Sequence, residues 1–265
     1  MKIKTLNLLW FSASSTTKKV IELIANELDI EERDEYDIAN RHLMSDNNLD
    51  SNDLLLIGMP VYGGRVPHVA ISSLLKLKGN NTPAIIVCVY GNRNYDDTLL
   101  EMKTIISKNG FKVIAAGAFI AQHSLFPKIG ANRPDKRDKD KIIEFAQESK
   151  NILSKIRNTD SIEDIFVKGN IPFKKKKKVP FLPKTNSGKC SKCRICYEAC
   201  PVSAISYRNP ANVEKSCISC ARCITVCPEN ARYFGGLLYY FVEKNFAIAY
   251  HSRKKPELFF SNIKE

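Results

Sequence analysis

Histidine and long hydrophobic runs are scarce in this sequence, and each scarcity argues against a class of function. The chain has only four histidines among its 265 residues, and they form no evident catalytic set: His42, His68, His123 and His251. The longest apolar stretch after the first 158 residues, 237–250, is interrupted by charged side chains and cannot span a bilayer. We therefore expect no catalytic histidine set and no membrane span.

We also expect no cleavable signal peptide. The N-terminus carries Lys2 and Lys4, but the apolar stretch that follows, LNLLWF, is short and is broken by Asn7. A signal peptide needs an apolar region of about 7–15 residues, so a buried strand explains this segment better. We expect a cytoplasmic protein.

Acidic residues are scarce in the C-terminal part of the chain. Residues 1–165 hold 22 basic and 22 acidic residues, whereas residues 166–265 hold 19 basic and 6 acidic residues and carry the whole formal charge of +13. A basic surface suits nucleic acid, anionic lipid or an acidic protein. The sequence has no nucleic-acid-binding motif, so we expect a partner protein with an acidic surface. The run Lys174–Lys178 is either a solvated linker or a docking patch.

Cysteine is present in an unusual number and order. Eight of the nine cysteines form two copies of the pattern C-x2-C-x2-C-x3-C-P, offset by 27 residues. Pro201 and Pro228 end the two copies, where proline terminates the local turn. This run is the one known from bacterial ferredoxins that carry two [4Fe–4S] clusters. The pattern therefore predicts single-electron transfer through two such clusters, and it makes the expected acidic partner a redox partner protein.

The spacing also predicts which cysteines share a cluster. Three cysteines at x2 spacing surround three corners of a cubane cluster, and the fourth points to the other cluster. The predicted ligands are Cys190, Cys193, Cys196 and Cys227 for one cluster, and Cys217, Cys220, Cys223 and Cys200 for the other. Each oxidised cluster with its thiolates carries about −2, which lowers the charge of the basic part to about +9.

Two other interpretations of the cysteines fit less well. Zinc ribbons use two C-x2-C pairs around each metal, and eight thiolates in triplet-plus-one spacing do not match them. A disulfide framework needs an oxidising compartment, of which the sequence gives no sign. The ninth cysteine, Cys88, lies in the apolar run AIIVCVY and is predicted to be a buried core thiol.

Residues 1–158 alternate between strand and helix patterns. Strands are predicted at 3–11, 36–39, 54–59, 84–90 and 111–120, and helices at 17–28, 69–77, 96–108 and 139–156. Apolar strands separated by helices indicate a parallel sheet covered on both faces. The predicted fold class is α/β, with a flavodoxin-like five-stranded parallel sheet in the order 2-1-3-4-5 and a second, small domain.

The rest of the chain divides into three parts. Residues 159–186 show few periodic signals and contain three prolines, which indicates a linker. Residues 187–232 are predicted to form a small α+β ferredoxin-like domain that is too short to fold without its metal. Residues 233–265 form an aromatic-rich C-terminal extension, and a helix in it could pack on either domain.

Three loops at the carboxyl end of the predicted sheet could hold a second cofactor, because ligands of open α/β sheets bind at this edge. The loop Ser12–Thr17 offers hydroxyls and free backbone N–H groups at a helix N-terminus, which suits a phosphate. The loops 60–67 and 91–97 each combine a tyrosine with glycine and could enclose a flat ring. Ordinary helix capping and tight turns would explain the same residues.

These loops carry a family resemblance. Residues 1–158 resemble the flavodoxin-type domain of flavodoxin–ferredoxin fusion proteins of anaerobic bacteria and archaea, in the stretches WFSASSTTKKV, PVYGGRVP, VYGNRNYDD, AQHS and ANRPD. With the cysteine repeat, the resemblance covers almost the whole chain, and it implies FMN as a cofactor. By this match the phosphate would contact Ser12, Ser14, Ser15, Thr16 and Thr17, and the isoalloxazine ring would contact Pro60, Val61, Tyr62, Gly63, Gly64, Gly91, Asn92 and Tyr95.

The phosphate loop departs from the family's usual S-G-T-G-N-T. Ala13 and Ser15 stand where the family has glycine, and Thr16 stands where it has asparagine. Glycine permits positive φ and a close approach of the backbone to an anion. Weakened FMN binding and a flavin-free domain both stay open. His123 and Ser124, after the fifth strand, could contact a flavin or form a structural turn.

The predicted function is an electron-transfer protein that passes electrons between FMN and two [4Fe–4S] clusters. One alternative is a flavin-dependent reductase of a small oxidant that uses the clusters as a wire. A further alternative is a ferredoxin whose flavodoxin-like domain only docks a partner.

Overall fold

The computed structural model describes residues 2–40, 48–176 and 179–264. His42 and the last two lysines of the run Lys174–Lys178 therefore lie outside the described residues.

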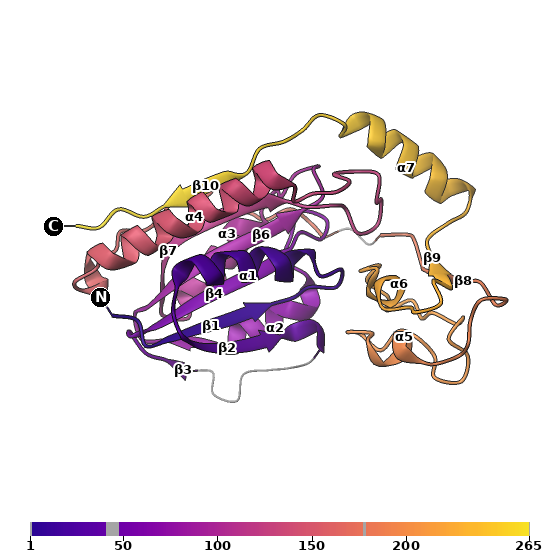
Figure 1. The fold of residues 1–265 in the computed structure, drawn as a ribbon, viewed down its shortest axis with the longest axis horizontal. Helices are drawn as coiled ribbons and strands as arrows, with labels where there is room; N and C mark the ends of the chain where they lie inside the picture. The colour runs from indigo at the N-terminus through magenta and orange to yellow at the C-terminus, as the bar shows by residue number, and fades with distance from the viewer. Residues whose placement is uncertain (1, 41–47, 177–178, 265) are drawn as a thin grey trace.

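Five parallel strands form most of the central sheet of the first domain (Figure 1). In spatial order they are β2 (Glu32–Asp37), β1 (Thr5–Trp10), β4 (Asp53–Pro60), β6 (Thr82–Tyr90) and β7 (Phe111–Ile120). This order confirms the predicted 2-1-3-4-5 arrangement. The strand expected near 36–39 begins earlier, at Glu32, and ends in a single 3-10 turn, Ile38–Asn40. This strand lies at the edge of the sheet, and most of its residues are charged and exposed. A search for apolar strand patterns therefore does not detect its first half.

A sixth strand comes from the other end of the chain and was not predicted. β10 (Glu257–Phe260) pairs antiparallel with β7, so that Glu257 lies opposite Ala118 and Phe260 opposite Ala115. The sheet is therefore mixed, with five parallel strands and one antiparallel edge strand.

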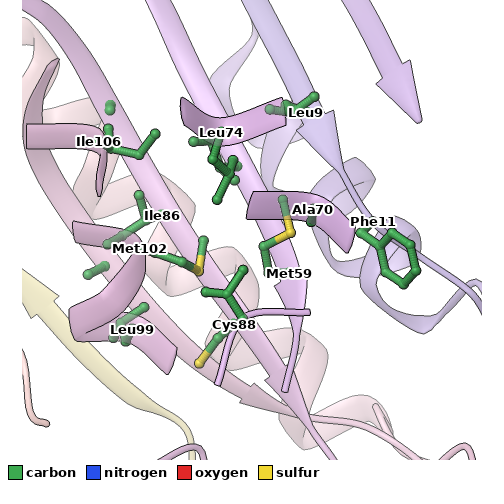
Figure 2. Close-up of a cluster of buried hydrophobic side chains, with 14 of the residues drawn as sticks. Leu9, Phe11, Met59, Ala70, Leu74, Ile86, Cys88, Leu99, Met102 and Ile106 are labelled. Atoms are coloured by element: carbon green, nitrogen blue, oxygen red, sulfur yellow. The ribbon is translucent and has the colours of Figure 1, made fainter. Parts of the chain in front are cut away.

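Helices cover both faces of the sheet, as predicted. α1 (Thr16–Leu28) and α4 (Lys136–Lys155) pack on one face, and α2 (His68–Lys76) and α3 (Thr98–Lys108) pack on the other. Cys88 lies in the hydrophobic core between the sheet and the helices α2 and α3, beside Met59 and Met102, and it has no exposed surface (Figure 2). It is the buried core thiol that the sequence predicts. Two short strands, β3 (Asn48–Leu49) and β5 (Lys78–Gly79), form a separate pair.

The first part of the predicted linker, residues 159–174, packs along the first domain. Ile165 and Val167 are buried in its core, and the backbone N–H groups of Asn170 and Lys174 donate to the Asp97 carboxylate at 2.9 and 2.6 Å. Lys174 also pairs with Asp96 at 3.0 Å. The described part of the lysine run is therefore partly held by internal ion pairs.

The cysteine region contains two short helices and a two-stranded ribbon. The helices are α5 (Ile195–Glu198) and α6 (Arg222–Thr225), and the ribbon joins β8 (Lys184–Thr185) to β9 (Arg232–Tyr233). The chain then forms α7 (Leu237–Ala249), which packs on Leu125 and Phe126 of the first domain and on Phe181 and Phe234, and returns to the sheet as β10. The extension therefore contacts both domains. In the described part of the chain, no helix is both long and apolar enough to cross a membrane.

Candidate functional site

The two cysteine repeats adopt the same local structure. α5 and α6 begin 27 residues apart, which is the offset of the sequence repeat. Arg194 and Ala221, at equivalent positions, both adopt left-handed backbone conformations, with φ of 65° and 66°. Such φ values are uncommon outside glycine, and they produce a sharp backbone turn at the same position in each cysteine loop. The N–H groups of Ala204 and Ala231 donate to the sulfurs of Cys200 and Cys227, both at 3.3 Å.

Two cavities lie between these loops, and each draws cysteines from both repeats. The first encloses about 340 Å³, counted out to solvent, and the second about 330 Å³. The cysteines that line them are Cys190, Cys193, Cys196 and Cys227 in the first cavity and Cys200, Cys217, Cys220 and Cys223 in the second. The structure thus gathers the cysteines in the same two sets that the spacing predicts. Cys193 is exposed, whereas Cys220 and Cys223 are buried.

A buried arginine lies beside both cavities. Arg232 is only 3 % exposed, and its Nη1 donates to Thr185 and to the Pro210 carbonyl at 3.1 and 2.5 Å and lies 4.0 Å from the Cys196 sulfur. Burial raises the pKa of Cys223, and the charge of Arg232 offsets part of this rise. Among the described residues, Nε and Nη2 of Arg232 are buried and have no hydrogen-bond partner. A buried cation with free donors fits an anionic group in these cavities.

Burial keeps the innermost thiols protonated when no metal binds them. It raises the pKa of Cys220 to about 12 and that of Cys223 to about 11. Cysteine binds a metal ion as the thiolate, so a bound metal ion must stabilise the deprotonated forms of Cys220 and Cys223. Cys220 and Cys223 are therefore poorly suited to act as free nucleophiles.

The loop Ser12–Thr17, which the sequence analysis assigns to a phosphate, makes a tight turn before α1. Ser15 adopts a left-handed conformation, with φ of 62°, immediately before α1. The hydroxyl of Ser12 accepts a hydrogen bond from the Lys18 N–H at 3.1 Å. Within the described residues, the backbone N–H groups of 14–17 donate to no protein acceptor. The loop therefore presents free donors at the positive end of a helix dipole.

Arg222 from the second cysteine loop reaches this phosphate loop. Its Nη1 donates to the Ser12 carbonyl at 3.1 Å, and its Nη2 donates to the side chain of Asn40. Its Nε is buried and has no partner among the described residues. Sequence reasoning missed Arg222 because it lies inside the cysteine motif. The sequence offered one indication that Arg222 has a role outside the cysteine motif, which is that the first repeat has Ile195 at the equivalent position.

The loop after β4 lies at the same junction. Tyr62 and Arg65 exchange backbone hydrogen bonds at 3.0 and 3.2 Å, and Gly63 and Gly64 between them have φ of 64° and 86°. The Tyr62 ring packs edge-on against Phe11. Burial, and then the neighbouring Cys220, raise the pKa of Tyr62 well above its usual value. Pro60 ends β4, and Val61 donates to the Val89 carbonyl at 2.9 Å, which holds the start of the loop.

The loop after β6 is used differently from the prediction. Asn92 is buried, and its amide donates to the carbonyls of Tyr250 and Ser252 at 2.7 and 2.9 Å. Tyr95 is 4 % exposed, and its hydroxyl donates to Glu257 of β10 at 2.8 Å. The side chains of Asn92 and Tyr95 therefore hold the C-terminal segment instead of facing an open ring-binding surface. A sequence reading could not anticipate this, because both partners lie about 160 residues away.

His123 forms a structural turn beside the predicted flavin loop. Its Nδ1 accepts from the backbone N–H groups of Leu125 and Phe126, both at 3.1 Å. A Cβ on Gly91 would lie 2.5 Å from the His123 ring, so the close packing of the two loops requires glycine there. Of the two possibilities left open by the sequence, the structure supports the turn.

One protein-family model matches part of the cysteine region. Residues 183–206 match the family described as a 4Fe-4S binding domain. A search of curated proteins gave no match. Among solved structures, the rubredoxin oxygen:oxidoreductase of the anaerobe Desulfovibrio gigas is 13 % identical with a TM-score of 0.45, over 59 % of this chain and 38 % of that chain.

Two flavodoxins align with this chain at similar levels. The flavodoxin of Streptococcus pneumoniae TIGR4 is 14 % identical with a TM-score of 0.40, over 57 % of this chain and 99 % of its own. The flavodoxin of Fusobacterium nucleatum, solved with bound flavin mononucleotide, is 13 % identical with a TM-score of 0.40, over 58 % and 98 %. By its own strand order and its iron–sulfur motif, the chain joins a flavodoxin-like domain to a ferredoxin-like domain, and this supports a role in electron transfer.

Proposed function

We propose that this protein passes electrons between FMN in its first domain and two [4Fe–4S] clusters in its cysteine region. The observation that carries the proposal is the pair of cavities, each lined by four cysteines from both repeats. The first cavity would bind one cluster through Cys190, Cys193, Cys196 and Cys227, and the second would bind the other through Cys200, Cys217, Cys220 and Cys223.

The surroundings of the cavities suit anionic clusters. Arg232 supplies a buried positive charge with two free donors beside the first cavity. Backbone N–H groups donate to Cys200 and Cys227, and such hydrogen bonds stabilise the negative charge on ligating sulfur. These groups would set the reduction potentials.

The first domain has the residues to hold FMN by its phosphate. The N–H groups of the loop Ser12–Thr17 and the partnerless Nε of Arg222 are donors that a phosphate would satisfy. The backbone of the loop around Gly63 and Gly64 would approach the ring, and Tyr62 of the same loop lies near Cys220. When bound, FMN exchanges one or two electrons, whereas each cluster exchanges one.

The positions of the two cavities give the relay an order. Cys220 packs in the same apolar cluster as Phe11 and Met59 of the first domain, so the second cavity adjoins the flavin loops. The first cavity contains the exposed Cys193, with Lys189 and Lys192 exposed nearby. Electrons would therefore pass between the flavin and the second cavity, then the first cavity, and then an acidic partner protein docked on this basic rim.

One observation favours the alternative of a ferredoxin with a flavin-free docking domain. Two residues expected to line the ring, Asn92 and Tyr95, are engaged with the C-terminal segment. Loss of their side chains from the ring site would weaken flavin binding. The flavin content of the purified protein decides between the two.

The test is anaerobic purification followed by assay of iron, acid-labile sulfide and flavin per chain. The proposal requires about eight irons, about eight sulfides and one FMN. Cys196→Ala should lose about half of the iron or more, whereas the matched control Cys88→Ala, which changes the one core cysteine, should keep all of it. Full iron content without flavin, even after FMN is added, would favour the flavin-free alternative.

A further inference from the structure

The structure points to a phosphate site built by both domains, and this inference rests on the proposed function. We infer that Arg222, although it belongs to the cysteine loop of the second cavity, binds the phosphate of FMN together with the loop Ser12–Thr17. The affinity for FMN would then depend on the state of the second cysteine loop. A phosphate loop in which serine and alanine replace glycine would thus be completed by a cation from the other domain.

The first argument is the placement of the guanidinium. Its Nη1 lies 3.1 Å from the Ser12 carbonyl, so the side chain already lies against the turn that precedes α1. Nη2 is held by Asn40, which follows β2 at the same edge of the sheet. The two contacts fix the plane of the guanidinium and leave Nε, which is buried, without an acceptor.

The second argument is charge. Among the described residues, no carboxylate lies within ion-pair distance of Arg222. The side chain of Arg222 is partly exposed, but its buried Nε has no acceptor, and a buried N–H of a cation is unfavourable unless an anion satisfies it. The free N–H groups of residues 14–17 lie on the same loop, so one phosphate could satisfy both sets of donors.

The third argument is the asymmetry of the repeat. The two cysteine loops share their helix positions and their left-handed residues, so a cluster makes the same demands on each. The position of Arg222 is occupied by Ile195 in the first repeat, and Ile195 is 39 % exposed. Arginine is therefore not needed at this position to form the loop, and its use in the second repeat is explained by the contact with the first domain.

A coupling between the two cofactors follows. Arg222 lies between Cys220 and Cys223, both of which line the second cavity, so the loop that orders around a cluster also sets the position of the guanidinium. A cluster in the second cavity should raise the affinity for FMN. By thermodynamic linkage, FMN should raise the retention of that cluster by the same factor.

The experiment compares two flavins that differ by the phosphate. The iron-loaded full-length protein, freed of flavin, is titrated anaerobically with FMN and with riboflavin while flavin fluorescence is followed. Arg222→Gln should raise the dissociation constant for FMN roughly ten- to a hundredfold and leave that for riboflavin unchanged. Arg222→Lys should recover part of the FMN affinity because it keeps the charge.

The matched control is Arg194→Gln, which removes an arginine from the cysteine loop of the first repeat. The Arg194 guanidinium lies 4.2 Å from the centre of the Tyr207 ring, and the variant should bind both flavins as the wild type does. Iron content equal to that of the wild type establishes that each variant is folded and loaded. Removal of iron with a chelator should weaken FMN binding and spare riboflavin binding.

The possible results separate the two proposals. Equal weakening of FMN and riboflavin in Arg222→Gln would mean that Arg222 only packs the interface, and an unchanged FMN affinity would place the phosphate elsewhere. Either result overturns the inference but leaves the relay intact. A wild-type protein that binds neither flavin would overturn the proposed function and this inference together.

Discussion

Replacement of the buried Arg232 by methionine should make the cluster potentials markedly more negative. Arg232 is 3 % exposed, and its Nη1 lies 4.0 Å from the Cys196 sulfur. Reduction adds one negative charge to a cluster, and a nearby cation stabilises that charge. Methionine is shorter than arginine but is flexible and unbranched, so it fills much of the same space while it removes the cation.

The magnitude follows from Coulomb's law. Two unit charges about 4 Å apart interact by about 4 kcal/mol at an effective dielectric constant of about 20. Because about 1.4 kcal/mol corresponds to about 59 mV for a one-electron couple, this energy corresponds to roughly 170 mV. The added electron is spread over the whole cluster, so its mean distance from Arg232 is greater, and we expect a shift of roughly 100 mV. Burial of Arg232 leaves little solvent screening to reduce it.

The assay is an anaerobic potentiometric titration followed by electron paramagnetic resonance. Arg232→Lys serves as the control because it keeps the charge and should shift the potentials much less. Iron and sulfide contents must equal those of the wild type in both variants. Potentials that do not change in a fully loaded Arg232→Met protein would refute the assignment of Arg232 as the charge that tunes the clusters.

Two further predictions concern the first domain. Burial lowers the pKa of His123 to about 4, so as the pH falls the unfolded state binds this proton before the folded state does. The contribution of His123 to stability, complete above about pH 6.5, should therefore be lost as the pH drops towards 4. Melting temperatures measured at pH 5.0 and 7.5 should differ less in His123→Asn than in the wild type. An equally steep fall in the variant would remove His123 as the cause. Tyr95→Phe deletes the hydrogen bond to Glu257 and should lower the free energy of unfolding by about 1–2 kcal/mol in urea titrations, and no change would mean that this bond does not hold β10.

The sequence was sufficient for the parts of the molecule that depend on local periodicity. β7 was predicted with its observed ends because ten consecutive residues, Phe111–Ile120, are mostly apolar and begin after a glycine. The division of the cysteines into two sets was also predictable, because the spacing in each repeat sets the direction of the fourth side chain.

The features that sequence reasoning missed depend on contacts between distant residues. β10 is only four residues long and follows the basic run Arg253–Lys255, so nothing local distinguishes it from a tail. Asn92 and Tyr95 resembled flavin contacts because a glycine precedes them, but their partners in space are the residues before and within β10. Arg222 was invisible for the same reason, since its role comes from the approach of two domains.

The return of the chain to the first domain makes the cysteine region an insertion held at both ends. It leaves the first domain through the packed segment around Ile165 and comes back through β10. A region tethered at one end can swing away on its linker, whereas one tethered at two ends samples far fewer orientations. Its effective concentration at the flavin loops is therefore fixed by covalent geometry. Electron exchange within the chain should then be first order and insensitive to both protein concentration and salt, and only the exchange with an outside partner should depend on them.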